Sequence, residues 1–268
     1  MLKTRIILIL ASGLTVWLIF LLPKSVVENE ANLNEGKSSP STDALHNTVD
    51  ASLQNQINTL KVRLSTETDK RNSSIFADSL ANLYNKATRY DSAALFAEKA
   101  NTFFESPESI LKTGEAFFQA FSFAMESSKR KKLALKAREY FQNILNANSH
   151  QLDVKTKMAL TFFGTGEPPM QGVNMLREVL AEDPKFKPAL FNMGMLSVQS
   201  QQFGKAIDWL NQLLAINPDD VQAVLLLGVA YAGNKEKDKA REQFEKAKKL
   251  DADPAVQQQA NAYLKDLQ

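Results

Sequence analysis

The apolar positions between residues 184 and 254 repeat with a fixed period of 34 residues. Three landmark residues recur one period later: Pro184 as Pro218, Gly194 as Gly228, and Ala206 as Ala240. The large apolar residues between these landmarks also align, since Leu190 corresponds to Val224 and Met193 to Leu227. A period of this size predicts stacked helical hairpins, because a single hairpin cannot bury its apolar face alone.

Apolar residues at helical spacing flank the repeats on both sides. Residues 44–66 place them three or four apart, which predicts one amphipathic helix with this stripe: Leu45, Val49, Leu53, Ile57, Leu60 and Leu64. We interpret this segment as an N-terminal helix that caps the first repeat, with a short dimerising coiled coil as the alternative. Residues 255–268 predict a C-terminal capping helix, with one apolar side: Val256, Ala260, Tyr263 and Leu264.

The repeats resemble the tetratricopeptide repeat (TPR) family. That family has small residues at positions 8, 20 and 27 of each unit and bulky residues at positions 4, 7, 11 and 24, so that paired helices pack closely. The best unit, residues 187–220, has Gly194 and Ala206 at two of the small positions, but Ser197 replaces the usual aromatic residue at position 11. The next unit, residues 221–254, is nearly complete and has Tyr231 there.

Three earlier segments fit the same pattern less completely. Residues 74–107 and 153–186 each keep most of the family positions. Residues 107–152 are longer than one unit, since the spacing between Gly114 and Ala137 exceeds the family spacing by about three helical turns. Whole turns lengthen helices without rotating their apolar faces, so we predict one elongated hairpin that turns near Ser127 and Ser128.

The resemblance implies an all-α fold, namely a right-handed α-solenoid of TPR helical hairpins over residues 74–254. Such a solenoid grows by adding units rather than by enlarging one core. Five hairpins are expected, at residues 74–107, 107–152, 153–186, 187–220 and 221–254.

The N-terminus carries a second apolar pattern. Residues 6–22 form an uncharged run that, as a helix, would span roughly 25 Å of a ~30 Å hydrocarbon core. We predict a transmembrane signal-anchor helix over residues 6–22, after a short cytoplasmic tail, residues 1–5. A polar, flexible linker over residues 23–43 would follow. A cleaved signal peptide and a buried core helix are the alternatives.

Basic residues predict the orientation of this helix. Lys3 and Arg5 precede the apolar run, and the positive-inside rule then keeps the N-terminus in the cytoplasm. Lys24 follows the run and weakens the asymmetry. We therefore expect a single-pass protein of the inner (cytoplasmic) membrane, with a periplasmic or extracytoplasmic TPR domain.

Composition narrows the functional classes. The chain has 32 Lys and Arg against 30 Asp and Glu, and this near-neutral balance argues against nucleic acid as a partner. It contains no cysteine, which excludes disulfides and thiolate metal sites. Its two histidines, His46 and His150, lack metal-ligand spacing, and the sequence shows no catalytic constellation. We therefore predict a protein that is not an enzyme and that needs no cofactor or metal ion.

In the TPR family, the first helices of successive hairpins line a concave groove that holds a peptide or a helix. The groove positions in this chain are mainly apolar: Phe191, Met195, Val198, Leu225 and Val229. Lys157, one unit earlier, is the only residue there that resembles the charged residues of carboxylate-clamp TPR proteins. We therefore expect a protein or peptide partner with an apolar or amphipathic segment. Alternatively, the capping helix or a neighbouring subunit fills the groove.

Two other segments are candidate contact surfaces. The basic run at residues 129–132 is expected to be solvated, with anionic lipid or an acidic partner as the alternative contact. The Phe-rich stretch at residues 115–125 is expected to form core, and any exposed part of it would be a docking site.

The sequence thus favours a membrane-tethered protein–protein interaction scaffold or adaptor. Its layout is similar to that of bacterial TPR subunits that assist the secretion translocon or cytochrome c assembly, which suggests a role in envelope protein assembly or secretion. The alternatives are a structural, homo-oligomerising membrane protein and a non-catalytic subunit of an enzyme complex.

Overall fold

The computed structural model describes residues 51–267. They lie within one compact unit, Val49–Gln268. The predicted cytoplasmic tail, transmembrane helix 6–22, linker 23–43 and first residues of the 44–66 helix lie outside the described residues. No helix within residues 51–267 is both long enough and apolar enough to cross a bilayer.

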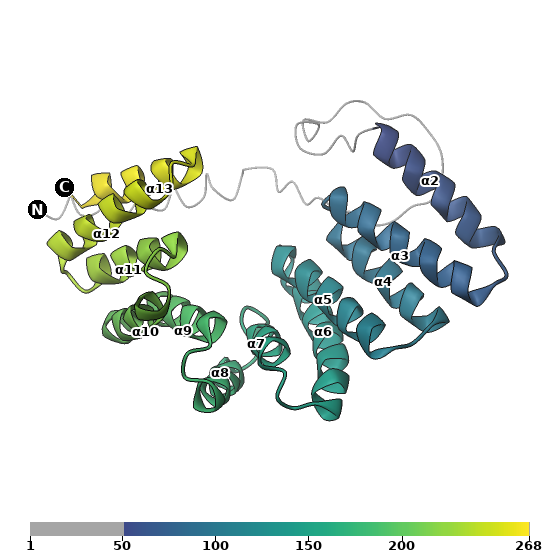
Figure 1. Cartoon of the computed structure of the whole chain (residues 1–268), viewed down its shortest axis with the longest axis horizontal. Coiled ribbons are helices and arrows are strands. Elements are labelled where there is room, and N and C mark those ends of the chain that lie inside the picture. The colour runs from purple at the N-terminus through teal and green to yellow at the C-terminus, as the bar shows by residue number, and fades with distance from the viewer. Residues whose placement is uncertain (1–50, 268) are drawn as a thin grey trace, which may run out of the picture. The chain divides into compact units, whose positions relative to one another are not determined.

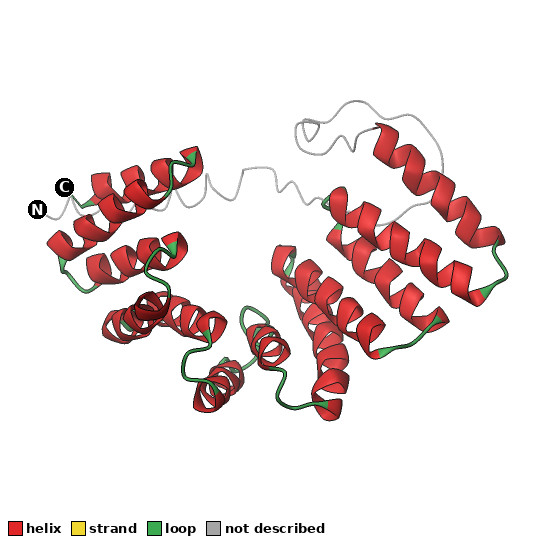
Figure 2. Ribbon diagram, in the orientation of Figure 1, coloured by secondary structure: helices red, strands yellow, loops and turns green. Residues whose placement is uncertain are grey.

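Regular structure in residues 51–267 is entirely helical (Figure 2). The helices are α2 (Ala51–Thr66), α3 (Lys70–Lys86), α4 (Tyr90–Phe103), α5 (Pro107–Phe123), α6 (Ser127–Ala147), α7 (Leu152–Leu160), α8 (Met170–Glu182), α9 (Lys187–Gln199), α10 (Phe203–Ile216), α11 (Val221–Gly233), α12 (Lys237–Leu250) and α13 (Pro254–Asp266). The prediction of an all-α array of helical repeats is confirmed, whereas its handedness stays a prediction.

Packing between these helices is mainly sequential (Figure 1). Each helix packs on the one before it and the one after it, and α9 also contacts α7 and α11, its counterparts in the neighbouring hairpins. The buried apolar residues form four clusters, centred on α2–α4, α4–α6, α8–α10 and α11–α13. This serial core is what a repeat array requires, since each unit contacts only its neighbours.

The described part of the predicted N-terminal helix is α2. Ile57 and Leu64 of its apolar stripe are buried, and Leu53 and Leu60 are partly buried, in the cluster formed with α3 and α4. These side chains contact the first hairpin of the same chain. They are therefore not free to form the seam of a dimerising coiled coil.

Local sequence sets several helix starts. Side chains at the starts of α3, α5, α11 and α13 accept a hydrogen bond from a backbone N–H in the following turn: Asp69, Ser106, Asp220 and Asp253. Proline stands in the first turn of α5, α9 and α13, where its missing N–H would have no helical partner anyway.

The recurring glycines mark close helix approaches. A Cβ atom at Gly228 on α11 would lie 2.5 Å from Cε1 of Phe244 on α12, which is well inside van der Waals contact. At Gly194, one period earlier, a Cβ would lie 2.8 Å from Cγ of Leu210 on α10. The period seen in the sequence therefore reflects a repeated contact between the two helices of a hairpin.

Gly228→Ala is expected to destabilise the chain by about 1–3 kcal/mol. The added methyl group meets the ring of the buried Phe244, and overpacking of this kind costs about that much. The matched control is Gly204→Ala on α10, where a Cβ meets nothing within 4 Å. Urea unfolding followed by circular dichroism measures both changes. Equal stability of the two variants would contradict the close approach at Gly228.

The hairpin of α5 and α6 is the longest. These helices have 17 and 21 residues, against 13 and 14 in α9 and α10. The chain turns between Phe123 and Ser127, so Ser127 is the first residue of α6 rather than part of the turn. Arg130 holds this turn, because its Nε and Nη2 donate to the carbonyl oxygen of Ala124 at 3.0 and 2.7 Å.

A buried tyrosine links α6 to α4. The Tyr140 hydroxyl donates to Glu98 Oε1 at 2.9 Å, and Lys136 Nζ lies 3.0 Å from the same oxygen. Burial of the hydroxyl, followed by its hydrogen bond to Glu98, raises the pKa of Tyr140 well above its ordinary value. The folded state therefore disfavours the phenolate.

This tyrosine predicts a loss of stability at alkaline pH. The pKa of Tyr140 is raised in the folded state. The contribution of its protonated hydroxyl to the free energy of unfolding is therefore complete below the unfolded pKa of about 10, and it is lost as the pH rises toward the folded pKa. Tyr140→Phe should cost about 1 kcal/mol at neutral pH through the lost hydrogen bond. It should also flatten the fall in stability above about pH 10. Urea unfolding of both proteins across this range tests the expectation, and parallel alkaline slopes would refute it.

Candidate functional site

The predicted groove residues of α9 form a half-buried apolar stripe. Phe191, Met195 and Val198 are four and then three residues apart, which places them on one face of the helix. Phe191 and Val198 pack at the margin of the buried cluster of α8–α10. Each of the three keeps part of its surface open, so this stripe is available to a second molecule.

Leu225 on α11 is not available in the same way. It is only 2% exposed and belongs to the buried cluster that also contains Phe244 of α12 and Val256 of α13. The prediction that Leu225 contacts a partner is therefore wrong for this structure. The last helix supplies apolar residues that close the final repeat, so Leu225 is core here.

Val229, one turn after Leu225, lines an open pocket of 620 Å³ between α11, α13 and the start of α10. Ala232 and Gly233 line it from α11, Tyr263 from α13 and Phe203 from α10. A Cβ at Gly233 would collide with the ring of Phe203, so glycine is needed for this approach. Val229, a predicted groove residue, therefore borders a small, mainly apolar pocket next to the capping helix, whereas its contact with a partner stays a prediction.

Lys157 on α7 is engaged within the chain. Its Nζ lies 2.5 Å from Glu115 Oε1 on α5 and 2.6 Å from Asp153 Oδ2 on α7. Burial lowers the pKa of Lys157, but hydrogen bonds to Asp153 and Glu115 outweigh that effect, so its pKa is raised and the side chain stays charged. Two carboxylates already neutralise this ammonium group, so it is a structural link between α5 and α7 rather than a free clamp for a partner's carboxylate.

The N-terminal helices of the array carry charge where α9 and α11 carry apolar residues. Lys112 on α5 pairs with Asp78 on α3, and Lys157 pairs with Glu115 as described. These ion pairs connect successive first helices of the hairpins. They are partly solvent-exposed, so each contributes little to stability but fixes side chains that a partner would otherwise contact.

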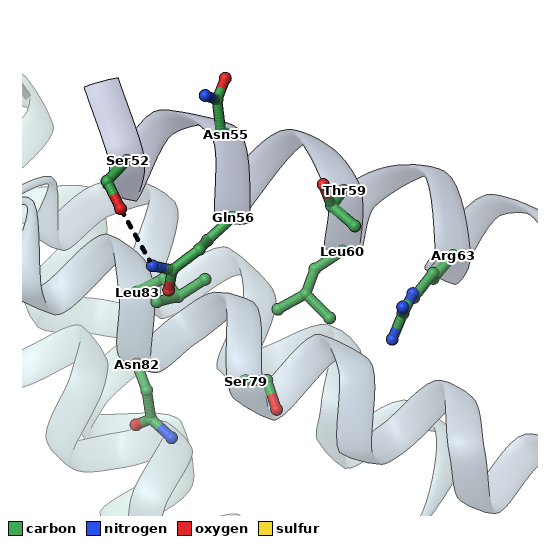
Figure 3. Close-up of a pocket in the computed structure, with 9 residues that line it drawn as sticks. All are labelled: Ser52, Asn55, Gln56, Thr59, Leu60, Arg63, Ser79, Asn82 and Leu83. Atoms are coloured by element: carbon green, nitrogen blue, oxygen red, sulfur yellow. Dashed lines mark hydrogen bonds between the residues drawn. The ribbon is translucent and has the colours of Figure 1, made fainter. Parts of the chain in front are cut away.

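A polar groove of 860 Å³ between α2 and α3 was not expected from the sequence (Figure 3). Asn55, Gln56 and Thr59 line it from α2, and Ser79 and Asn82 line it from α3, with Arg63 as its one lining charge. Gln56 Nε2 donates to Ser52 Oγ at 3.5 Å along its edge. Sequence reasoning missed this groove because it followed only the apolar stripe of α2.

The two other candidate surfaces are the basic run at residues 129–132 and the Phe-rich stretch at residues 115–125. In each of them, some residues have structural contacts and others are exposed. In the basic run, Lys129 pairs with Asp91 on α4 and Arg130 holds the α5–α6 turn. In the Phe-rich stretch, Phe117 and Phe121 are buried core. Phe123 and Met125, near the end of the stretch, are exposed, although the Phe123 ring stacks on Tyr90 with a centroid distance of 4.4 Å.

No group of three or more His, Cys, Asp or Glu residues within 51–267 could hold a metal ion. His150 is exposed and contacts Glu182, whereas His46 lies outside the described residues. What residues 51–267 offer is surface for binding, namely the α9 stripe and the pockets beside α3, α8 and α11.

A family model described as Tetratricopeptide repeat matches residues 171–222 and 197–262. Residues 171–262 of this protein therefore carry tetratricopeptide repeats. The match runs from α8 into α13 and includes the segment where the period of the sequence is clearest. No enzyme family was found, and no curated protein matches the chain.

TTC0263 and MamA are solved structures that show the same fold at low sequence identity. The chain is similar to TTC0263, a thermophilic TPR protein of Thermus thermophilus, with 17% identity, a TM-score of 0.53, and coverage of 71% of this chain and 98% of that one. A MamA crystal structure aligns with 18% identity, a TM-score of 0.50, and coverage of 66% and 96%. YrrB, a TPR protein with an unusual peptide-binding site, aligns with 17% identity, a TM-score of 0.46, and coverage of 77% and 99%.

Proposed function

We propose that this protein is a membrane-tethered, non-enzymatic scaffold that binds an apolar or amphipathic segment of a protein partner. The observation that carries the proposal is the half-buried stripe of Phe191, Met195 and Val198 on α9. It spans about 10 Å along the helix, which matches two turns of an amphipathic helix laid against it. The open pocket at Val229 extends the apolar surface toward the C-terminal end of the array.

The N-terminal sequence supports the tether. An uncharged run at residues 6–22 behind two basic residues suits an uncleaved anchor in the inner membrane, with the repeats on the periplasmic side. An anchored scaffold meets other membrane or exported proteins at a raised effective concentration. Assistance to envelope protein assembly or secretion is the setting that fits this layout.

Site-specific photocrosslinking tests the α9 stripe. A photoreactive residue at position 191 of the full chain in cells should give a discrete protein adduct, and one at the exposed position 245 on α12 should not. Phe191→Ala combined with Val229→Ala should reduce the adduct formed from position 195 about ten-fold, since a few buried apolar contacts dominate such interfaces. The same adducts from positions 191 and 245, or an unchanged yield in the double variant, would reject the assignment.

Thiol labelling tests the tether. The chain has no cysteine, so single cysteines at Ser38 in the linker and at Glu242 on α12 report topology without background. Both should react with a membrane-impermeant maleimide once the outer membrane is permeabilised, before cell lysis. Labelling of either position only after lysis would place the repeats in the cytoplasm and overturn the proposed orientation.

Self-association is the second candidate, because one specific surface favours it. Ile75 on α3 and Phe104 after α4 are 53% and 64% exposed and lie together at an open pocket of 520 Å³ with Arg71 and Ser74. Exposed apolar pairs of this kind are typical of contact surfaces. Sedimentation velocity of the full chain in nanodiscs, with and without Phe104→Glu, separates the two candidates. A monomer in both cases excludes assembly through this surface.

A further inference from the structure

A pocket of 520 Å³ lies between α8, α9 and α10, away from the α9 stripe. On α9 it is lined by residues such as Met193, Leu196 and Ser197. At 100° per residue, these positions point to the side of the helix opposite Phe191 and Met195. The pocket is therefore a separate surface from the one in the proposed function, and its occupant need not be the same molecule.

The pocket exists at the place where this repeat departs from its neighbour. Ser197 stands one period before Tyr231, which packs against the apolar clusters on both sides of α11. In the α9 unit no aromatic ring occupies the corresponding position, and Ser197 lines the pocket with 8% of its surface exposed. Serine is too small to fill a space that elsewhere in the array takes a tyrosine ring, so an apolar side chain from outside can enter it.

The walls suit a large apolar side chain. They are formed by aromatic and flexible apolar residues: Phe163, Met170, Val173, Met193, Leu196 and Trp209. Methionine adapts its shape to the group that it contacts, and tryptophan offers a broad ring face. Met170 is 55% exposed at the rim, which leaves the pocket open to solvent for entry.

The charges at the rim are all positive. Arg177 and Lys205 line the pocket, and no Asp or Glu does. Arg177 Nη1 donates to Asn174 Oδ1 at 3.4 Å, and Lys205 Nζ donates to Gln202 Oε1 at 2.7 Å. Neither cation forms an ion pair within the described residues. A ligand with carboxylates beside its apolar group would therefore complement this rim.

Polar groups at the pocket favour a peptide over a fatty acid. The Ser197 hydroxyl makes no hydrogen bond within residues 51–267, and the Gln199 side chain is exposed at the edge. These groups can form hydrogen bonds with a peptide backbone, whereas a hydrocarbon chain has no donor or acceptor to offer them. We propose that this pocket is a second binding site, which takes one large apolar side chain of a partner segment that carries glutamate or aspartate next to it.

Tryptophan fluorescence provides the test on the full chain in zwitterionic nanodiscs. The chain has two tryptophans, so Trp17→Phe leaves only Trp209, inside the pocket, as reporter. The probes are short acetylated peptides with one Phe between two Glu residues, and matched peptides with Lys in place of Glu. The Glu peptide should change Trp209 emission saturably and bind about ten-fold more tightly than the Lys peptide. Arg177→Gln with Lys205→Gln should remove that preference.

Filling the pocket provides the second arm. Ser197→Tyr supplies the ring found one period later and should abolish binding of the Glu peptide, whereas Asn211→Tyr, on the exposed side of α10, should not. Circular dichroism checks that the Ser197→Tyr variant folds. If that variant does not fold, the variant with Arg177→Gln and Lys205→Gln still tests the proposal. Equal binding of the Glu and Lys peptides, full binding by Ser197→Tyr, or saturable binding of laurate without binding of the Glu peptide would overturn it.

Discussion

Phe244→Ala is expected to lower the free energy of unfolding by about 3–5 kcal/mol, the usual cost of removing a buried aromatic side chain. Phe244 on α12 is 1% exposed, packs against Gly228 on α11, and stacks on Tyr263 of α13 with a centroid distance of 4.9 Å. One side chain thus joins the last three helices. Removal of the Phe244 ring leaves a cavity that the backbones of these three helices cannot close.

The location of the effect matters as much as its size. In a repeat array each unit depends on its neighbours, so the loss should be confined first to the C-terminal end. Amide hydrogen exchange should show lost protection in α11–α13 and unchanged protection in α2–α4. The matched control is Phe104→Ala, an exposed phenylalanine near the other end, which should cost less than about 0.5 kcal/mol. A uniform loss of protection along the chain would contradict a serial core.

Arg138→Ala is expected to lower the free energy of unfolding by about 2 kcal/mol. Arg138 on α6 holds the loop between α7 and α8: its Nη2 donates to the Thr161 carbonyl oxygen at 2.8 Å and pairs with Glu167. Its guanidinium group also lies 3.8 Å from the ring centroid of Phe162. Truncation would leave a buried carbonyl group and a carboxylate without their partner, and lost charge-assisted hydrogen bonds cost about that much.

The same residue gives a pH signature. The hydrogen bond from Arg138 lowers the pKa of Glu167, so this contribution is present above the unfolded pKa of about 4.3 and is lost as the pH falls through the folded value. Urea unfolding at neutral and acidic pH should therefore show a smaller acid-induced loss in Arg138→Ala than in the parent. Arg241→Ala, which breaks an exposed pair with Asp238, serves as control and should change stability by less than about 0.5 kcal/mol.

The sequence predicts the structural role of Phe244 but not that of Arg138. Phe244 lies at a family position one period after Leu210, so its burial followed from the repeat. Arg138 lies in an ordinary helical stretch, and its partners Thr161 and Glu167 lie in the loop between α7 and α8, which the helical spacing of apolar residues does not describe. Periodicity reports which positions are buried, but not which polar groups a loop brings back to a helix.

The candidate site was predictable only in part. The stripe of Phe191, Met195 and Val198 follows from helical spacing, and the structure leaves it half open. Leu225 has the same spacing but is buried, because its accessibility depends on which helix packs next to it. Lys157 has the expected charge, yet Glu115, 42 positions away in the sequence, already neutralises it.

The sequence by itself determined the helices, their pairing into hairpins and the positions of close contact, because these depend on neighbours within one or two turns or one period. It also marked Ser197 as a departure from the pattern. Only the tertiary structure decided whether that departure leaves a pocket, whether Leu225 is core, and which charges remain for a ligand. Burial and charge neutralisation depend on side chains from several helices at once, and the spacing along one helix does not contain that information.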